Sequence, residues 1–208
     1  PKGVVIEHGN VAALLAWAGQ CYSREELAYV LASTSLSFDL SVFELLAPLS
    51  VGGALVLAQD ALELVEHPHR DRVTFLNTVP SAAQELVRLE ALPASLRVVA
   101  LAGEPLRGAL VSAIWPRLPP TARLFNLYGP TECTVYATAA ELTRDDRSEP
   151  SIGLPISGLL ARVVDDEGAP VPRGAIGELV LAGRSVGRGY LGPPELSEAR
   201  FGPDLLDP

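Results

Sequence analysis

One short segment of the sequence gathers side chains that could bind a nucleotide and a metal ion. Between Asn126 and Glu132 the chain carries an amide, a phenol, a Gly-Pro turn, a hydroxyl and a carboxylate. The ring of Tyr128 can stack on a nucleobase while the amide of Asn126 bonds to the base edge. The hydroxyl of Thr131 can contact phosphate, and the carboxylate of Glu132 can bind Mg²⁺. The same residues also suit a strand that ends in a tight turn with a half-buried tyrosine, and on this segment alone that interpretation is favoured.

Further segments, in matching order along the chain, complete a pattern that resembles the amino-acid adenylation domains of nonribosomal peptide synthetases. Asn126–Glu132 matches their Asn-x-Tyr-Gly-Pro-Thr-Glu motif. Pro1–Val4 is similar to the end of their phosphate loop, and Phe38–Ser41 to the segment whose aspartate pairs with the substrate amine. Leu101–Glu104 resembles the strand end that borders adenine, and Gly177–Leu191 the motif that leads into the β-barrel subdomain. The resemblance identifies an internal piece of the large N-terminal subdomain, covering less than half of such a domain.

The resemblance implies ATP-dependent activation of an amino acid. The substrate carboxylate attacks the α-phosphate of ATP, and aminoacyl-AMP and pyrophosphate form. The thiol of phosphopantetheine on a carrier protein then takes the aminoacyl group. Catalysis in such a reaction is mainly positioning and neutralisation of charge. The implied cofactors are ATP, Mg²⁺ and phosphopantetheine, and the implied partners are the amino acid, a peptidyl carrier domain, a condensation domain and an MbtH-like protein.

The resemblance also implies roles for individual residues. Catalytic roles fall to Thr131, to Glu132 as the Mg²⁺ ligand, and to Lys2 beside the phosphate loop, although a solvated lysine is the simpler interpretation of Lys2. The expected nucleotide contacts are Gly103, Glu104, Asn126, Leu127, Tyr128, Gly129 and Thr131. The expected lining of the amino-acid pocket is Asp39, Leu40, Phe43, Asn77, Ala100, Ala102, Leu127, Val135 and Tyr136.

The composition of this pocket indicates a small neutral amino acid. Asp39 would pair with the α-ammonium group, although an aspartate beside Ser41 at a helix start is often only a cap. The other members carry no second charge, so a charged substrate side chain would be buried unpaired and rejected. Bulky residues such as Phe43 shorten the pocket, and the set is similar to those of alanine-activating domains. Serine or cysteine is the alternative if Asn77 is free rather than bonded to Tyr136.

Two other functions remain compatible with parts of the sequence. One is a nucleotide-binding scaffold without turnover, because the family's upstream phosphate loop, ribose-binding aspartate and C-terminal lysine are not among these residues. The 208 residues alone are therefore expected to be inactive. The other is an acyl-CoA ligase that also forms an adenylate. Asp39 argues against it, since fatty and aryl acids have no α-ammonium group to pair.

Alternating strand and helix patterns are expected to position these residues. Strands are predicted at Ala54–Ala58, Val73–Asn77, Arg97–Ala102 and Arg123–Leu127. Helices are predicted at Val11–Ala18, Ser23–Leu31, Ser41–Ala47, Ser81–Leu92 and Arg107–Trp115. Ser23 with Glu26, and Ser41 with Glu44, have the spacing of capping boxes. The alternation predicts an α/β fold with a mostly parallel sheet layered with helices, whose ligand site lies at the carboxyl ends of the strands.

The pattern changes near residue 145. Short strands at Leu160–Val164 and Glu178–Ala182, separated by turn-forming residues, predict a β-rich portion. We therefore expect an α/β subdomain over residues 1–145, carrying the substrate and adenine sites. A truncated, barrel-like β subdomain is expected over residues 146–208.

Composition excludes several other classes of protein. The chain is 48% hydrophobic and 20% charged, which is typical of a globular protein. Its apolar runs are too short for a membrane span, and a net charge of −9 disfavours nonspecific nucleic-acid binding. Cys21 and Cys133 form no redox or zinc motif, and no secretory signal opens the chain, so a cytoplasmic protein is expected. The sequence contains no methionine, and we expect it to be a piece of a longer polypeptide.

Overall fold

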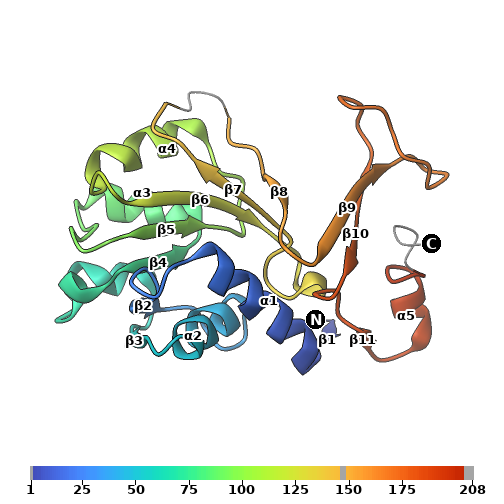
Figure 1. Ribbon diagram of the computed structural model, residues 1–208, viewed down its shortest axis with the longest axis horizontal. Helices are drawn as coiled ribbons and strands as arrows, with labels where there is room; N and C mark the ends of the chain where they lie inside the picture. Colours follow the sequence, from blue (N-terminus) through green and yellow to red (C-terminus); the bar gives the residue numbers. More distant parts are fainter. Residues whose placement is uncertain (1, 146–148, 204–208) are drawn as a thin grey trace.

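A seven-stranded sheet forms the centre of the computed structural model, which describes residues 2–145 and 149–203 (Figure 1). From one edge to the other, the strands are β3 (Ala54–Leu57), β2 (Tyr29–Ala32), β4 (Phe75–Thr78), β5 (Val98–Leu101), β6 (Arg123–Tyr128), β7 (Thr138–Leu142) and β8 (Leu154–Pro155). The first five run parallel, and β7 and β8 are antiparallel additions. The predicted mixed α/β fold with a mostly parallel central sheet is confirmed.

Helices cover both faces of this sheet. One face carries α3 (Pro80–Arg88) and α4 (Gly108–Ile114), and the other carries α1 (His8–Cys21) and α2 (Leu40–Ser50), as Figure 1 shows. Single 3₁₀ turns lie between the longer elements: η1 (Ala61–Val65), η2 (Arg70–Arg72), η3 (Trp115–Arg117) and η4 (Thr131–Cys133).

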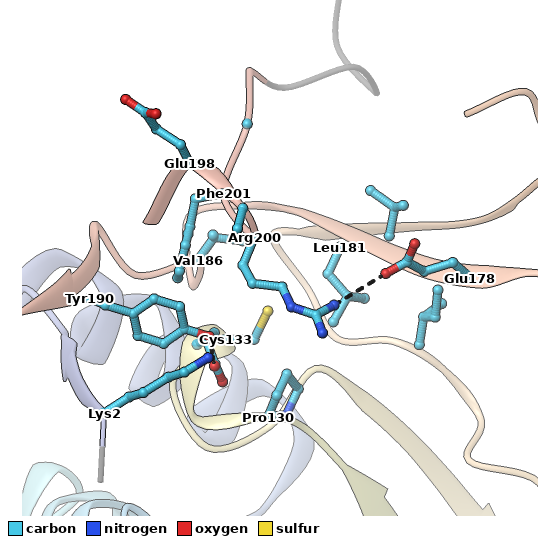
Figure 2. A pocket seen from close by; sticks show the side chains of 15 residues that line it. Lys2, Pro130, Cys133, Glu178, Leu181, Val186, Tyr190, Glu198, Arg200 and Phe201 are labelled. Atoms are coloured by element: carbon cyan, nitrogen blue, oxygen red, sulfur yellow. Dashed lines mark hydrogen bonds and ion pairs between the residues drawn. The ribbon is translucent and has the colours of Figure 1, made fainter. Parts of the chain in front are cut away.

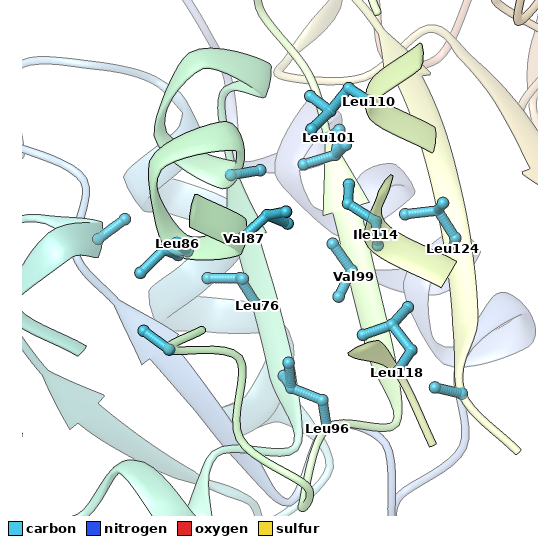
Figure 3. Packing of buried hydrophobic residues seen from close by; sticks show 14 of the residues in the cluster. Leu76, Leu86, Val87, Leu96, Val99, Leu101, Leu110, Ile114, Leu118 and Leu124 are labelled. Atoms are coloured by element: carbon cyan, nitrogen blue, oxygen red, sulfur yellow. The ribbon is translucent and has the colours of Figure 1, made fainter. Parts of the chain in front are cut away.

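Alternation along the strands divides the core into two layers. In β5, Val99 and Leu101 pack toward α3 and α4 (Figure 3), while Val98 and Ala100 pack toward α1 and α2. This is the period of two that a strand imposes on its side chains. Every residue of β5 is buried, as expected for a parallel strand covered on both faces.

Beyond the sheet the chain forms two antiparallel pairs. β9 (Leu159–Val164) pairs with β10 (Glu178–Gly183), and β1 (Gly3–Val5) pairs with β11 (Gly189–Leu191), beside the short helix α5 (Pro194–Glu198). In the described residues these are separate two-stranded sheets and not a closed barrel. The central sheet continues past residue 145 through β8, and the subdomain boundary at that position stays a prediction. Pro1, part of the expected phosphate-loop end, lies outside the described residues.

The helix predicted over Ser23–Leu31 is wrong. Its first half is a single turn, in which Ser23 and Glu26 do form the reciprocal bonds of a capping box. Its second half is β2, which pairs with both β3 and β4. A short apolar run suits a buried strand as well as a helix, and here pairing with a strand on each side decides the outcome.

The capping box predicted for Ser41 and Glu44 is also wrong. The helix begins at Leu40, so Ser41 lies inside its first turn, where its hydroxyl donates to the Phe38 carbonyl. Glu44 is fully buried and accepts hydrogen bonds from the Ser33 and Thr34 amides and from the Thr34 hydroxyl, at 2.8–3.0 Å. Burial raises the pKa of this carboxyl group, an effect that the three hydrogen bonds oppose.

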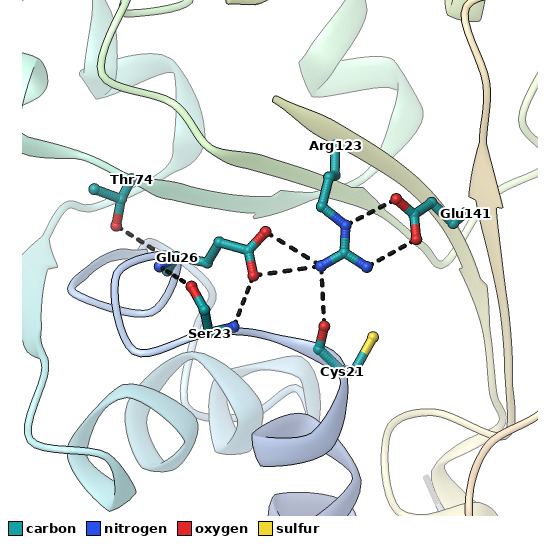
Figure 4. Close-up of polar contacts among 6 residues, drawn as sticks. All are labelled: Cys21, Ser23, Glu26, Thr74, Arg123 and Glu141. Atoms are coloured by element: carbon teal, nitrogen blue, oxygen red, sulfur yellow. Dashed lines mark hydrogen bonds and ion pairs between the residues drawn. The ribbon is translucent and has the colours of Figure 1, made fainter. Parts of the chain in front are cut away.

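An ion-pair cluster ties the start of β6 to the turn after α1 (Figure 4). The Arg123 guanidinium donates to both oxygens of Glu141 at 2.8 Å, to Glu26 at 3.2 Å and to the Cys21 carbonyl at 2.9 Å. The hydrogen bond from Arg123 lowers the pKa of Glu141. Because Glu26 is also held by Ser23, the cluster fixes the entry into β2 relative to β6.

No helix in the described ranges is both long and apolar enough to span a membrane.

Candidate functional site

Three neighbouring strands, the start of α2 and the loop after β6 together bring most of the expected amino-acid pocket into one region. Asn77 on β4 lies directly opposite Ala100 on β5. The expected pocket residues that share the buried layer beneath α1 and α2 are Phe43, Ala100, Ala102, Leu127, Val135 and Tyr136, with Leu40 packed against them. The rings of Phe43 and Tyr136 meet edge to face at 5.3 Å between centroids. The structure thus gathers these residues into one apolar region.

Asn77 and Tyr136 are bonded to each other inside this region. The Tyr136 hydroxyl donates to Asn77 Oδ1 at 2.8 Å, and both side chains are fully buried. Burial raises the pKa of Tyr136 well above its usual value, whereas the bond to Asn77 lowers it. Asn77 Nδ2 is buried without a hydrogen-bond partner. A buried amide donor without a partner is uncommon in native proteins and indicates a place for a ligand atom or a water molecule.

Asp39 lies at the edge of the same region. It occupies the N-cap position of α2, yet its side chain caps no backbone amide, so the capping role is not the one the structure shows. Its carboxylate is partly exposed, and its charge contributes to the raised pKa of Tyr136. A partly exposed carboxylate at the edge of a buried apolar cluster is placed to hold a cationic group.

The loop that follows β6 carries Thr131, Glu132, Val135 and Tyr136 through an unusual backbone. Gly129 passes so close to Val135 that an added Cβ would lie 2.4 Å from the Val135 carbonyl oxygen. Thr134 and Val135 have φ values of +55° and +74°. A positive φ is uncommon in non-glycine residues and costly for β-branched ones, and strained backbone of this kind clusters at functional sites.

The expected nucleotide contacts lie at the carboxyl ends of β5 and β6. The ring of Tyr128 is 38% exposed, enough to offer a face for stacking. Asn126 is buried, and its amide nitrogen donates to the Ser151 carbonyl at 2.8 Å. Gly103 is exposed with φ +84°, which lets the backbone approach a ligand closely. The Glu104 carboxylate instead accepts two hydrogen bonds from Ser81 at the start of α3, one from the backbone amide and one from the hydroxyl.

Glu132 and Lys2 border a cavity of about 650 Å³ between η4, β10, β11 and α5 (Figure 2). Glu132 accepts a hydrogen bond from the Tyr190 hydroxyl, and Lys2 Nζ lies 4.8 Å from the centre of the Tyr190 ring. Lys2 is exposed, but its ammonium group lies over the Tyr190 ring and is not surrounded by solvent alone. Cys133 also borders the cavity, and burial raises its pKa to about 11, so its thiol is protonated near neutral pH.

The carboxylate of Glu132 suits a magnesium ion carried in by a nucleotide. The described residues hold no group of three or more His, Cys, Asp or Glu side chains that could form a metal cage. Mg²⁺ in nucleotide enzymes commonly uses one or two carboxylates together with phosphate oxygens and water. The Glu132 carboxylate is partly exposed, follows Thr131 in the chain and borders the cavity, which fits that type of site.

Comparison with protein families matches residues 1–191 to the AMP-binding enzyme family. The chain belongs to this family.

The chain is similar to nonribosomal peptide synthetases in particular. It is 48% identical over its whole length to a linear gramicidin synthase of Brevibacillus parabrevis, and spans 4% of that protein. It is 49% identical over 97% of its length to the AMB antimetabolite synthetase AmbB of Pseudomonas aeruginosa, and spans 16% of it. The crystal structure of the four-domain synthetase holo-AB3403, bound to AMP and glycine, matches the whole chain with a TM-score of 0.87 at 31% identity, over 16% of that protein. The chain therefore covers a small part of each relative's length.

Proposed function

We propose that this chain is the core of an adenylation domain, which activates an amino acid as aminoacyl-AMP within a larger synthetase. The observation that carries the proposal is the position of Asp39 at the edge of a buried apolar region. Asp39 lies at the edge of a buried region built from Phe43, Ala100 and Tyr136, and its carboxylate makes no capping bond. A substrate with an ammonium group and a compact apolar side chain matches this arrangement.

The nucleotide would lie along the carboxyl ends of β5 and β6. Tyr128 would stack on the adenine ring, with Asn126 and the backbone of Gly103 beside the base edge. Thr131 would contact the α-phosphate, and Glu132 would hold Mg²⁺, which neutralises charge on the phosphate oxygens. The protein's part in the reaction is to align the amino-acid carboxylate with the α-phosphate and to stabilise the developing charge. Lys2 would add positive charge from the other side of the cavity.

We propose alanine as the preferred amino acid. The fully buried rings of Phe43 and Tyr136 narrow the region, and the Tyr136 hydroxyl already occupies one side of Asn77. Serine is the second candidate, because the unpartnered Asn77 Nδ2 could donate to a substrate hydroxyl. A difference of one methyl or hydroxyl group is worth about 1–3 kcal/mol in an apolar pocket, so glycine and serine should appear as side substrates.

The test is amino-acid-dependent ATP–pyrophosphate exchange by the full-length protein, run with each standard amino acid and with propionate. Alanine should give the strongest signal, followed by serine. Propionate matches alanine without the ammonium group and should give none. Activity with fatty or aryl acids would identify an acyl-CoA ligase, and nucleotide binding without exchange would identify a scaffold. Preference for a large or charged amino acid would refute the pocket assignment.

The partners follow from the proposed chemistry. The aminoacyl group would pass to the phosphopantetheine thiol of a peptidyl carrier domain and then to a condensation domain. An MbtH-like protein is a further proposed partner. Mass spectrometry of a carrier protein incubated with ATP and alanine would detect the loaded thioester as a defined mass increase.

A further inference from the structure

The loop between β6 and β7 holds a backbone conformation that needs support from elsewhere. The Tyr136 amide donates to the Thr134 carbonyl at 3.0 Å, which closes a three-residue γ-turn centred on Val135. With φ +74° at its centre, this turn is of the strained kind, and the centre is a β-branched residue. Thr134, immediately before it, is left-handed, with φ +55° and ψ +69°. Neither residue is of the type that adopts such angles readily.

The side chain of Thr134 supplies the support. Its hydroxyl donates to the Ser185 carbonyl at 2.7 Å, across 51 positions of sequence, and the bond is buried. The Thr134 side chain is 2% exposed, so water does not offer a ready replacement for this bond. A buried hydroxyl that lost its partner would destabilise the conformation that buries it.

The segment that accepts this bond is itself fixed. The Asn10 amide, at the start of α1, donates to the carbonyls of Arg184 and Val186, on either side of Ser185, at 2.8 and 2.9 Å. The Gly187 amide donates back to the Glu132 carbonyl at 2.8 Å. The loop is therefore bonded at two points to a segment that α1 holds in place.

We infer that Thr134 is a positioning residue. Its hydrogen bond to the Ser185 carbonyl, here called the latch, holds the strained turn in place and thereby fixes the positions of the pocket residues that the turn carries. The turn carries Val135 and Tyr136, two lining residues of the proposed pocket, and Tyr136 in turn orients Asn77. Without the latch, the turn relaxes toward ordinary φ values and moves both lining residues. Tyr128, which precedes the turn on β6, keeps its place, since β7 pairs with it directly. The inference rests on the proposed function and concerns amino-acid binding more than nucleotide binding.

The chain offers a matched control. Thr138 on β7 is also 2% exposed, and its hydroxyl donates to the Ile152 carbonyl at 2.6 Å. Thr138 lies in a regular strand with no positive φ. Thr134→Val and Thr138→Val therefore each remove one hydrogen bond from a buried threonine, the Thr138 bond being part-buried, and only the first releases the strained turn.

The experiment measures Michaelis constants for alanine and ATP, by pyrophosphate exchange, together with the melting temperature, in the full-length protein. Thr134→Val should raise the KM for alanine about three- to tenfold, the range expected for one hydrogen bond, while the KM for ATP changes less than about twofold. Thr134→Ser, which keeps the hydroxyl, should behave like the parent. Thr138→Val should lower the melting temperature by a similar amount without changing the KM for alanine. Thr134→Gly also lacks the hydroxyl but adopts a positive φ without strain, so it should fold and show a smaller rise in the KM for alanine than Thr134→Val.

An unchanged KM for alanine in Thr134→Val, or an equal rise in Thr138→Val, would overturn the inference. Failure of both Thr134→Val and Thr134→Gly to fold, with Thr138→Val folded, would also overturn it by making the hydroxyl a requirement for stability alone. A parent without amino-acid-dependent exchange contradicts the proposed function. If the full-length protein is active and its Thr134 variants keep the same KM for alanine, only the role of the Thr134 hydrogen bond is contradicted.

Discussion

Removing the Tyr136 hydroxyl should both destabilise the protein and change its preference among amino acids. The hydroxyl is fully buried and donates to Asn77 Oδ1 at 2.8 Å, while Asn77 Nδ2 already lacks a partner. In Tyr136→Phe, Asn77 loses this bond inside the core. A buried polar atom left unpaired costs about 1–3 kcal/mol. We expect the free energy of unfolding to fall by that amount, measured as a shift of the urea midpoint at constant slope.

The same substitution should favour serine over alanine. Without the tyrosine hydroxyl, Asn77 offers both an acceptor and a donor to the substrate, and a serine hydroxyl can satisfy both. A neutral hydrogen bond contributes about 0.5–1.5 kcal/mol, so the ratio of kcat/KM for serine to that for alanine should rise about two- to tenfold. The ratio is measured by pyrophosphate exchange on the full-length protein.

The double variant Tyr136→Phe/Asn77→Leu is the control. Replacing both members of a buried hydrogen bond by apolar groups is often nearly neutral, so stability should recover while the gain for serine disappears. The reasoning is refuted if Tyr136→Phe is as stable as the parent, or if it loses stability with no change in the serine-to-alanine ratio. The second result would mean that Asn77 does not face the substrate side chain.

Three further substitutions test other parts of the account. Tyr128→Ala should raise the KM for ATP about five- to a hundredfold, because stacking of the base contributes about 1–3 kcal/mol, and should raise the KM for alanine much less. An equal rise in both constants would indicate a folding defect, which circular dichroism detects. Glu44 has a raised pKa when folded, so the folded state binds more protons and stability falls as pH rises above the ordinary value of 4.5. Glu44→Gln should remove that fall in urea titrations between pH 4 and 7, and parallel curves for variant and parent would contradict the raised pKa. Arg123→Gln should lower the unfolding free energy by about 2 kcal/mol, since it breaks charged hydrogen bonds to Glu26 and Glu141, and a change below about 0.5 kcal/mol would show that solvent replaces them.

The parallel sheet could be predicted from sequence because its strands are short, apolar and separated by helical patterns. β4, β5 and β6 all appear within two residues of their predicted bounds. β2 was missed because Tyr29–Ala32 follows a genuine capping pair, Ser23 and Glu26, which indicates a helix. Only pairing with β3 and β4, which are distant in sequence, makes this segment a strand.

The expected pocket came from the resemblance to adenylation domains, and its role stays a prediction; the structure brings most of its members into one buried region. Tertiary bonds could not be obtained in the same way. Glu44 had the spacing of a cap, yet it turns inward to the loop at Ser33, a contact that spacing on one helix does not predict. Thr134 carried no signal at all, since threonine is not a residue that marks a left-handed turn.

The exchange rate of the Asp39→Ala variant tests the central claim most directly. If Asp39 holds the α-ammonium group, its removal leaves a charge unpaired in a partly desolvated site, which costs about 3–5 kcal/mol. The full-length variant should then lose a hundredfold or more, roughly, in kcat/KM for alanine, with AMP binding retained. Asp39→Asn should also be poor, because an amide does not neutralise an ammonium charge. Exchange near the parental rate in Asp39→Ala would contradict the assignment of this site to an amino acid.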